Sequence, residues 1–348
     1  MRHLVFIYFM AVLGVATLPH CSSKKGNKTQ QGPKEKASNG VKTPLKKTER
    51  TVSSKIRMEL RKIHDNIYMA RGVNGLPSVD NKGFMSNSYG ILTSEGWFVV
   101  DALTTPKLSE LFIQMLKREK NVPIKYLVIT HYHQDHWYGA QSYQAIGTQI
   151  IAHKNLKASY EGNGKAILAA SHNRFKIYAN VKLTPPTIVI DKESKKFKMG
   201  AMEIEVLPFT PAHTNTDLVV YLPKEEVMFV GDMVNKGRIP FAGDRTASSR
   251  GWIKYLEKMK TYKIKMLLTG HNDPLAKSDI DFNLGYLKYM RKEITRMKDE
   301  GLSINEVKAK LLKTPYTKGD KIDFFHNLNI YAFYNKIGIT EMLEEGNE

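Results

Sequence analysis

Three histidines and an aspartate fall within six consecutive residues of this 348-residue chain, in the order His-x-His-x-Asp-His. They are His131, His133, Asp135 and His136. Burying such side chains without partners would cost several kcal/mol, so they are not ordinary core residues. Neutral imidazole and carboxylate are together typical ligands of zinc and related divalent ions. The cluster therefore predicts a metal site.

The cluster follows a short apolar segment, Ile124 to Thr130, whose Ile, Leu and Val content predicts a buried strand. The metal-binding residues then lie where a strand ends and the chain turns toward a helix. Alternation along extended backbone would direct His131, His133 and Asp135 to one side, with His136 turned toward a second centre.

Three more residues of metal-binding type each follow an apolar run of their own. His213 lies in the segment TPAHT, Asp232 follows VMFVG, and His271 follows KMLLTG. A strand followed by a candidate ligand thus occurs four times in order. At all seven positions, over roughly residues 60 to 275, the sequence resembles the metallo-β-lactamase superfamily.

Two strand-rich halves with helices between them predict the α/β class, as a four-layer α/β/β/α metallo-β-lactamase sandwich with a C-terminal helical extension. The predicted divisions are a signal peptide over 1–20, a Lys-rich tether over 21–55, the metallo-β-lactamase domain over 56–275 and the C-terminal helices over 276–348. A first run of strands is expected at 66–71, 87–93, 97–101, 124–130 and 149–153. A second run is expected at 187–191, 196–199, 202–207, 217–222 and 227–230. Helices are expected at 107–120, 139–146, 154–180, 248–260, 277–299, 303–313 and 328–345.

The resemblance also implies a role for each candidate ligand. One zinc ion would be held by His131, His133 and His213, and a second by Asp135, His136 and His271, with Asp232 bridging the two. Asp101, which ends a strand of its own, would contact a ligand histidine and orient its ring. Alternatively, Asp101 would have only a structural role, with its carboxylate in a turn or at the N-terminus of the following helix.

The chemistry implied by the resemblance is hydrolysis by a hydroxide that bridges two metal ions, because coordination lowers the pKa of water from 15.7 to about 7. Asp135 would orient this hydroxide and carry a proton to the leaving group. A carboxylate at Asp232, where the best-known zinc β-lactamases have a thiolate, is similar to the glyoxalase II, lactonase and phosphodiesterase branches. Because a carboxylate is a harder ligand than a thiolate, iron or manganese are alternatives to zinc at this site. The segment from Gly231 to Pro240 resembles an exported branch, the quinoprotein-relay zinc metallohydrolases.

These features predict a dinuclear zinc hydrolase that acts on a small ester, thioester, lactone or amide, with a β-lactam as one version. Two alternatives stay open: a phosphodiesterase or nuclease of the same fold, and a tethered binding lipoprotein without catalysis. The mildly basic domain gives little support to a nucleic-acid partner. Candidate substrate contacts are Arg238, Trp137 and Tyr138. Arg238 would pair with a substrate carboxylate or, alternatively, form a salt bridge with Asp244.

The N-terminal segment has the composition of an exported, anchored tether. Residues 4–16 are apolar but too short for a membrane span, and the single cysteine, Cys21, follows them. This resembles a bacterial lipoprotein site and predicts a lipid anchor on Cys21 in the cell envelope; the alternative is an incidental cysteine after an ordinary signal or an uncleaved anchor. Residues 22–55 have too few large apolar side chains to fold. Residues 1–55 hold 11 Lys and Arg against two Asp and Glu, in a chain of net charge +19, which suits attraction to anionic lipid.

Overall fold

The computed structural model describes residues 57–338, apart from 74, 79, 175 and 318–323. The expected signal segment, Cys21 and the tether lie outside the described residues. Among the described helices, none is both long enough and apolar enough to cross a membrane.

The strands of the described residues form two sheets. The first has the strand order β1-β2-β3-β4-β5-β6-β7, antiparallel up to β4 and parallel from β4 onward. Its strands are β1 (Leu60–His64), β2 (Ile67–Ala70), β3 (Ser88–Thr93), β4 (Gly96–Val100), β5 (Ile124–Val128), β6 (Gln149–His153) and β7 (Ile188–Ile190). The second sheet has the order β12-β11-β10-β9-β8. Its strands are β8 (Lys195–Met199), β9 (Met202–Pro208), β10 (Leu218–Leu222), β11 (Val227–Gly231) and β12 (Met266–Thr269).

The edge strand β7 corrects one expectation. The sequence grouped residues 187–191 with the second run of strands, but β7 pairs in parallel with β6 in the first sheet. Parallel neighbours need a long crossover connection, and the helices α4 (Lys154–Glu161) and α5 (Gly164–Arg174) lie in this one. A three-residue apolar strand has no sequence signal for the sheet that it joins.

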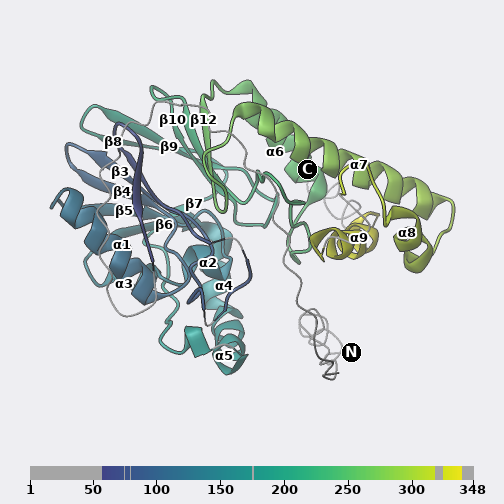
Figure 1. The fold of residues 1–348 in the computed structure, drawn as a ribbon, viewed down its shortest axis with the longest axis horizontal. Coiled ribbons are helices and arrows are strands. Elements are labelled where there is room, and N and C mark those ends of the chain that lie inside the picture. Colours follow the sequence, from purple (N-terminus) through teal and green to yellow (C-terminus); the bar gives the residue numbers. More distant parts are fainter. Residues whose placement is uncertain (1–56, 74, 79, 175, 318–323, 339–348) are drawn as a thin grey trace, which may run out of the picture. The chain divides into compact units, whose positions relative to one another are not determined.

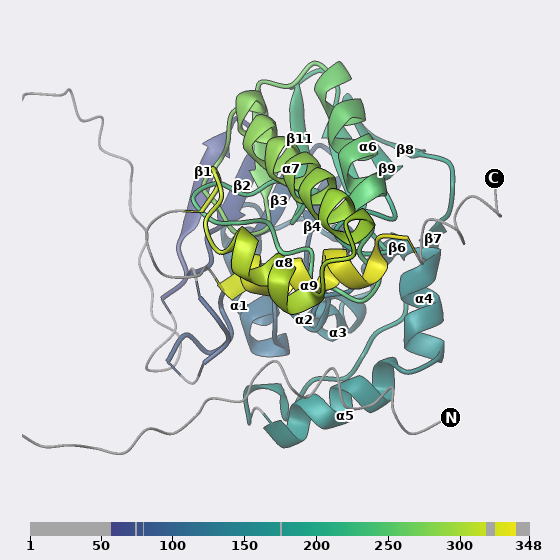
Figure 2. The same ribbon diagram turned by 90° about the vertical axis from the view of Figure 1, so that its right-hand side faces the viewer.

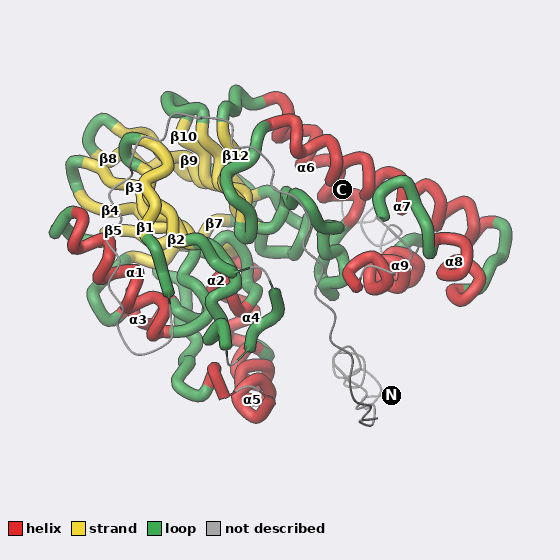
Figure 3. Tube along the Cα trace, viewed as in Figure 1, coloured by secondary structure: helices red, strands yellow, loops and turns green. Residues whose placement is uncertain are grey.

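The two sheets pack face to face. Along β4, Phe98 packs among residues of both sheets, with its ring centroid 5.8 Å from that of Phe197. The preceding residue, Trp97, points the other way and packs beneath the outer helices, as the alternation of strand side chains requires. Figure 3 shows the strands gathered between helices on either side. The predicted four-layer α/β/β/α sandwich is confirmed.

The outer face of the first sheet is covered by α1 (Pro106–Glu119) and α3 (Ala140–Gln144), which follows the short helix α2 (Gln134–Trp137) (Figure 1). The helix α1 begins where the Thr105 side chain accepts the backbone N–H of Leu108, with Pro106 in the first turn. Leu108, Phe112 and Leu116 form its fully buried stripe at the spacing of a helix face.

The helix α6 and the C-terminal helices complete the opposite outer layer. They are α6 (Ser249–Thr261), α7 (Ile280–Asp299), α8 (Ile304–Leu311) and α9 (Phe324–Lys336). Leu287 of α7 and Trp252 of α6 share one apolar core with Val219 of the second sheet. Figure 2 shows α9 crossing the line of α7, against which it packs. The helix expected at 328–345 begins four residues earlier, at Phe324, and residues 339–348 lie outside the described part.

Candidate metal centre

The histidine cluster lies where β5 leaves the first sheet. The strand β5 ends at Val128, residues 131–133 form bends, and α2 begins at Gln134. Asp135 and His136 are therefore successive residues of a helix, where side chains turn by about 100° per residue. The expected alternation that placed Asp135 beside His131 and His133 is wrong, and Asp135 lies with His136 instead.

The structure brings all seven candidate ligands together. His213 follows β9, Asp232 follows β11 directly, and His271 follows β12. His131, His133 and His213 form one group, here called the first triad, whose ligand atoms lie within 4.8 Å of one another. Asp135, His136 and His271 form the second triad by the same measure.

In the first triad, three ring nitrogens face one another. His133 Nδ1 lies 3.0 Å from His131 Nε2 and 3.1 Å from His213 Nε2. The opposite nitrogen of each ring is paired with an oxygen. These pairs are His131 Nδ1 with Thr130 Oγ1 (3.1 Å), His133 Nε2 with Asp244 Oδ2 (3.0 Å) and His213 Nδ1 with the Phe241 carbonyl (3.0 Å).

These outer contacts fix the tautomers of the first triad. A carbonyl or a carboxylate can only accept, so His213 Nδ1 and His133 Nε2 carry their protons. The Thr130 hydroxyl donates to Asp101 and is left to accept from His131 Nδ1. Three lone pairs therefore point at one another from about 3 Å, an arrangement that is repulsive until a cation lies among them. The first triad fits a metal ion.

The second triad is built in the same way. His271 Nε2 lies 3.3 Å from Asp135 Oδ2, and His136 Nε2 lies 3.3 Å from the same oxygen. The outer nitrogen of His271 donates to the Met85 carbonyl at 2.9 Å. Asp135 Oδ2 and His136 Nε2 are buried and have no hydrogen-bond partner among the described residues. Orphaned polar atoms of this kind, converging on one point, fit a second cation.

Asp232 lies between the two triads. Its Oδ2 is 3.1 Å from His271 Nε2 and 3.9 Å from His213 Nε2, and its Oδ1 is 3.6 Å from His136 Nε2. The buried Oδ1 has no hydrogen-bond partner within the described part of the chain. A Cβ on Gly270 would come within 2.0 Å of this oxygen, so glycine is required there.

Asp101 makes the kind of contact that the resemblance implied. Its Oδ2 lies 2.8 Å from His136 Nδ1, and its two oxygens also accept the backbone N–H and the hydroxyl of Thr130. The residue has φ of +64°, a conformation that is costly for aspartate. The three hydrogen bonds hold it there, and they fix the ring of His136.

Burial and charge set the protonation states of the first triad and of the carboxylates. Burial lowers the pKa of His213 to about 3 and holds that of His131 well below its ordinary value. For His133, the hydrogen bond and charge of Asp244 outweigh burial and raise the pKa. Burial alone would raise the pKa of Asp135, but the facing histidines of its own triad hold it well below the usual range. The pKa of Asp232 is lowered in the same way. Neutral imidazoles and ionised carboxylates are the ligand forms that bind divalent ions.

The histidines of the second triad lie among carboxylates, and their pKa values shift upward. Burial lowers the pKa of His136, but the charges of Asp135 and Asp101 outweigh burial and hold it well above its ordinary value. For His271, the charge of Asp232 likewise outweighs burial and raises the pKa. A divalent ion would take the place of the inner proton on these rings, so metal binding there releases protons.

The candidate substrate residues differ in their positions. Arg238 does not pair with Asp244: its Nε donates to Asn235 Oδ1 at 2.9 Å, and its Nη2 lies 3.9 Å from Asp232 Oδ2. Trp137 and Tyr138 are each only 3% exposed and belong to the core under the first sheet. Their burial leaves them as packing residues rather than substrate contacts.

Three oxygens that orient the histidines could not be identified from the sequence. Two are the main-chain carbonyls of Phe241 and Met85, which have no signature in a sequence. The third belongs to Asp244, which the sequence suggested only as a partner for Arg238. Asp244 also accepts the Tyr132 hydroxyl at 2.5 Å.

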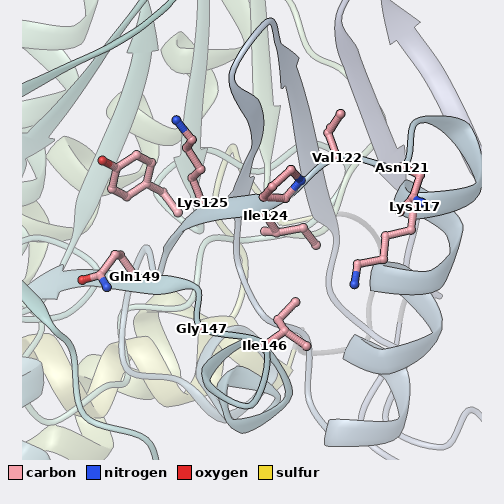
Figure 4. Close-up of a pocket in the computed structure, with 10 residues that line it drawn as sticks. Lys117, Asn121, Val122, Ile124, Lys125, Ile146, Gly147 and Gln149 are labelled. Carbon is pink, nitrogen blue, oxygen red and sulfur yellow. The ribbon is translucent and has the colours of Figure 1, made fainter.

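A hollow of about 680 Å³ lies elsewhere, at the opposite ends of the parallel strands. It is lined by the end of α1 and the starts of β5 and β6, with Lys117, Lys125 and Gln149 at its surface (Figure 4). Lys125 is already paired with Glu95 at 2.9 Å. Because the histidines follow the other ends of these strands, this hollow is separate from the metal centre.

Comparison with known proteins agrees with this geometry. A family model described as the metallo-beta-lactamase superfamily matches residues 81–271. The chain is 20% identical over 242 residues to a metallo-beta-lactamase type 2 of Elizabethkingia meningoseptica, covering 68% of this chain and 88% of that protein. It is 19% identical over 263 residues to a linear primary-alkylsulfatase of a Pseudomonas strain, covering 65% of this chain and 49% of that protein.

Two solved structures share the fold. A metallo-beta-lactamase from Pontibacter korlensis superposes with a TM-score of 0.54 at 21% identity, covering 66% of this chain and 99% of that chain. A stereoselective inverting sec-alkylsulfatase from Pseudomonas sp. superposes with a TM-score of 0.66 at 17% identity, covering 82% of this chain and 52% of that chain. Since the family model spans more than half of the sequence and includes every one of the clustered residues, the chain belongs to the metallo-β-lactamase superfamily.

Proposed function

We propose that this protein is a metal-dependent hydrolase with a two-zinc centre, acting on a small ester, thioester, lactone or amide. One observation carries the proposal. Each of the five clustered histidines has one nitrogen paired with an outer oxygen and turns the other toward the cluster. A set of imidazoles preorganised in this way, around two ionised carboxylates, is what a divalent metal site needs.

The residues divide between two ions. The first triad would hold one ion and the second triad the other, with the Asp232 carboxylate between them. When bound, such ions lower the pKa of water to near neutrality and polarise the bond that is to be cleaved.

The chain's own residues supply the proton transfer. Asp135 is ionised at neutral pH because His136 and His271 hold its pKa well below the usual range. It can therefore accept a proton from the attacking water and pass it to the leaving group. The Ser86 hydroxyl donates to the Asp135 carbonyl at 2.5 Å, which helps to fix the start of α2.

Arg238 is a fixed cation at the rim of the centre. Its Nε donates to Asn235, and its guanidinium lies 5.8 Å from the centroid of the Phe325 ring. Asn235 is itself held, because its N–H donates to Asn283 Oδ1 and its side chain donates to the Asp232 carbonyl. The side chain of Arg238 is 30% exposed and faces Asp232. We propose that it binds an anionic group of the substrate, such as a carboxylate.

The names of the relatives widen the choice of reporter substrates. Two relatives are metallo-beta-lactamases and two are alkyl or aryl sulfatases. A β-lactam and an alkyl sulfate therefore join the ester, thioester and lactone as test substrates. A phosphodiester reporter tests the alternative of a phosphodiesterase of the same fold.

Export and anchoring are part of the proposal. The apolar stretch at 4–16 followed by Cys21 supports a lipoprotein of the cell envelope, and the segment Gly231 to Pro240 supports the exported quinoprotein-relay branch. Incorporation of radiolabelled palmitate into the expressed chain, and its loss in Cys21→Ser, is the expected result. Equal labelling of both chains would contradict the anchor.

The decisive experiment measures metal and activity together. Metal content per protein is determined by elemental mass spectrometry on the purified chain and on Asp232→Ala, alongside hydrolysis of the reporter panel. About two ions per chain, with both metal and one activity lost in the variant, is the expected result. A protein that takes up no metal and cleaves no reporter after zinc is added would leave the tethered binding protein as the better hypothesis.

A further inference from the structure

The C-terminal helix α9 contacts residues 240–247, the segment that orients two histidines of the first triad. Asn329, in the middle of α9, is fully buried. Its side-chain oxygen accepts the backbone N–H of Ala242 at 2.8 Å, and its side-chain nitrogen donates to the carbonyl of Pro240 at 2.7 Å. One amide thus binds the main chain on both sides of Phe241.

The residue between these two contacts orients a candidate ligand. The Phe241 carbonyl accepts from His213 Nδ1 at 3.0 Å. The Phe241 ring also lies beside that histidine, with centroids 6.2 Å apart. Fixing the peptide groups on either side of Phe241 therefore fixes the carbonyl that sets the tautomer and direction of His213.

A second contact from α9 supports the same segment further along. Lys336 Nζ donates to the main-chain carbonyls of Asp244 and Ala247, the latter at 3.0 Å. The Asp244 carboxylate lies 3.0 Å from His133 Nε2. Two of the three histidines of the first triad are thus oriented by a segment that α9 holds at both ends.

The helix α9 is itself locked in place by buried polar contacts. His326 Nε2 donates to the Leu311 carbonyl at 2.7 Å, and its Nδ1 lies 3.0 Å from the Tyr286 hydroxyl. Asn329 donates to the same hydroxyl at 3.0 Å. A buried amide with all these partners is costly to replace, since each lost bond leaves a buried polar group unpaired. Packing alone would need only an apolar side chain at this position.

We infer that α9 positions two histidines of the metal centre and that Asn329 is a positioning residue for His213. The inference rests on the proposed metal centre, whose first triad it concerns. It assigns the C-terminal helices a role beyond covering the second sheet, because they set the geometry of two histidines more than 110 residues earlier in the chain.

The test compares Asn329→Asp with a control on the same helix. The carboxylate of Asn329→Asp keeps the shape and the acceptor for Ala242, but it cannot donate to the Pro240 carbonyl. Ile330→Val is the control, because Ile330 is also fully buried on α9 and its side chain has no polar atom. Lys336→Met is a second variant, which removes the hydrogen bonds to the carbonyls of Asp244 and Ala247. It keeps the inference testable if Asn329→Asp does not fold.

The first readout is taken without metal. Nitrogen-15 NMR of the imidazoles in the metal-free full chain should show His213 with Nδ1 protonated in the parent protein and in Ile330→Val. In Asn329→Asp the His213 signals should shift and broaden, and in Lys336→Met those of His133 should do so. The second readout is zinc affinity by chelator competition, in which one of two sites should weaken about tenfold and the other should stay within twofold.

The outcomes separate this inference from the proposed function. His213 signals and both zinc affinities that match Ile330→Val would overturn the role of Asn329, even if the protein hydrolyses a reporter. A parent chain that binds no zinc would overturn the proposed function, whereas the metal-free NMR comparison would still decide whether α9 orients the histidines.

Discussion

Asp101 Oδ2 lies 2.8 Å from His136 Nδ1, although Asp101 must adopt φ of +64° to place it there. The other carboxylate oxygen accepts the backbone N–H of Thr130 at 2.8 Å. Oδ2 also accepts the Thr130 hydroxyl at 2.9 Å, but a hydroxyl can rotate and accept instead, whereas a backbone N–H can only donate. The bond to the backbone N–H therefore determines how an amide would lie in place of the carboxylate. In Asp101→Asn the amide oxygen would stay with Thr130, and the amide nitrogen would then face His136 Nδ1.

Asp101→Asn is therefore expected to reverse the tautomer of His136. An amide donor at Nδ1 moves the ring proton to Nε2, the nitrogen that faces Asp135 and Asp232. We expect zinc affinity at one of two sites to fall by about 10- to 100-fold, measured by chelator competition. Asp65→Asn, at an exposed turn, is the control. Unchanged affinity in Asp101→Asn would mean that the contact does not set the tautomer.

Removal of metal is expected to destabilise the fold. Without a cation, the inward lone pairs of His131, His133 and His213 face one another at about 3.0–3.1 Å. Zinc at 100 times its dissociation constant should add about 2.7 kcal/mol per ion. Thermal unfolding in zinc and in excess chelator measures the difference. The comparison is Asp232→Ala, whose melting temperature zinc should raise less than it raises that of the parent chain. Equal melting temperatures in zinc and chelator would contradict a metal site.

The positions of the candidate ligands could be predicted from the sequence because each follows an apolar strand. A strand end fixes where a residue lies in the sheet, so the sequence alone places His213, Asp232 and His271 at one edge. The helical start at Gln134 could not be predicted, because four residues are too few to show a helical period.

The outer partners of the histidines were beyond prediction for a different reason. Main-chain carbonyls such as that of Phe241 are present in every residue, and only the path of the chain selects one of them. Asn329 lies 116 residues after His213 and acts on it through two intermediate groups. Single asparagines in a helix are common, so neither spacing nor composition marks this one.

Arg238 is expected to distinguish anionic from neutral substrates. A charge-assisted hydrogen bond contributes about 1.5–3 kcal/mol, so Arg238→Ala should raise KM for an anionic reporter by roughly 10- to 100-fold. A neutral ester should show little change in KM. The matched control is Lys236→Ala, because Lys236 is an exposed cation of the same loop that pairs with Asp279 at 3.0 Å. An equal loss with both reporters would contradict anion binding and indicate a structural role instead.

His153 provides a pH dependence that is independent of the metal centre. It ends β6, and its Nδ1 accepts the backbone N–H of Asn155 at the start of α4. Burial lowers its pKa from 6.5 to about 4. Between those values the unfolded chain binds more protons at this residue than the folded chain does, so its contribution to stability rises with pH across the window. The contribution is present above pH 6.5 and is lost as pH falls toward 4.

The variant that isolates this effect is His153→Asn, because asparagine can accept the same N–H and does not titrate. The free energy of unfolding of the parent chain, relative to that of His153→Asn, should fall by roughly 2 kcal/mol between pH 6.5 and pH 4. Urea unfolding of both metal-free chains at matched pH measures this difference, and contributions from the clustered histidines cancel because both chains contain them. A constant difference across this range would show that His153 is protonated in the folded state as readily as in the unfolded one, and its role would then be limited to capping α4.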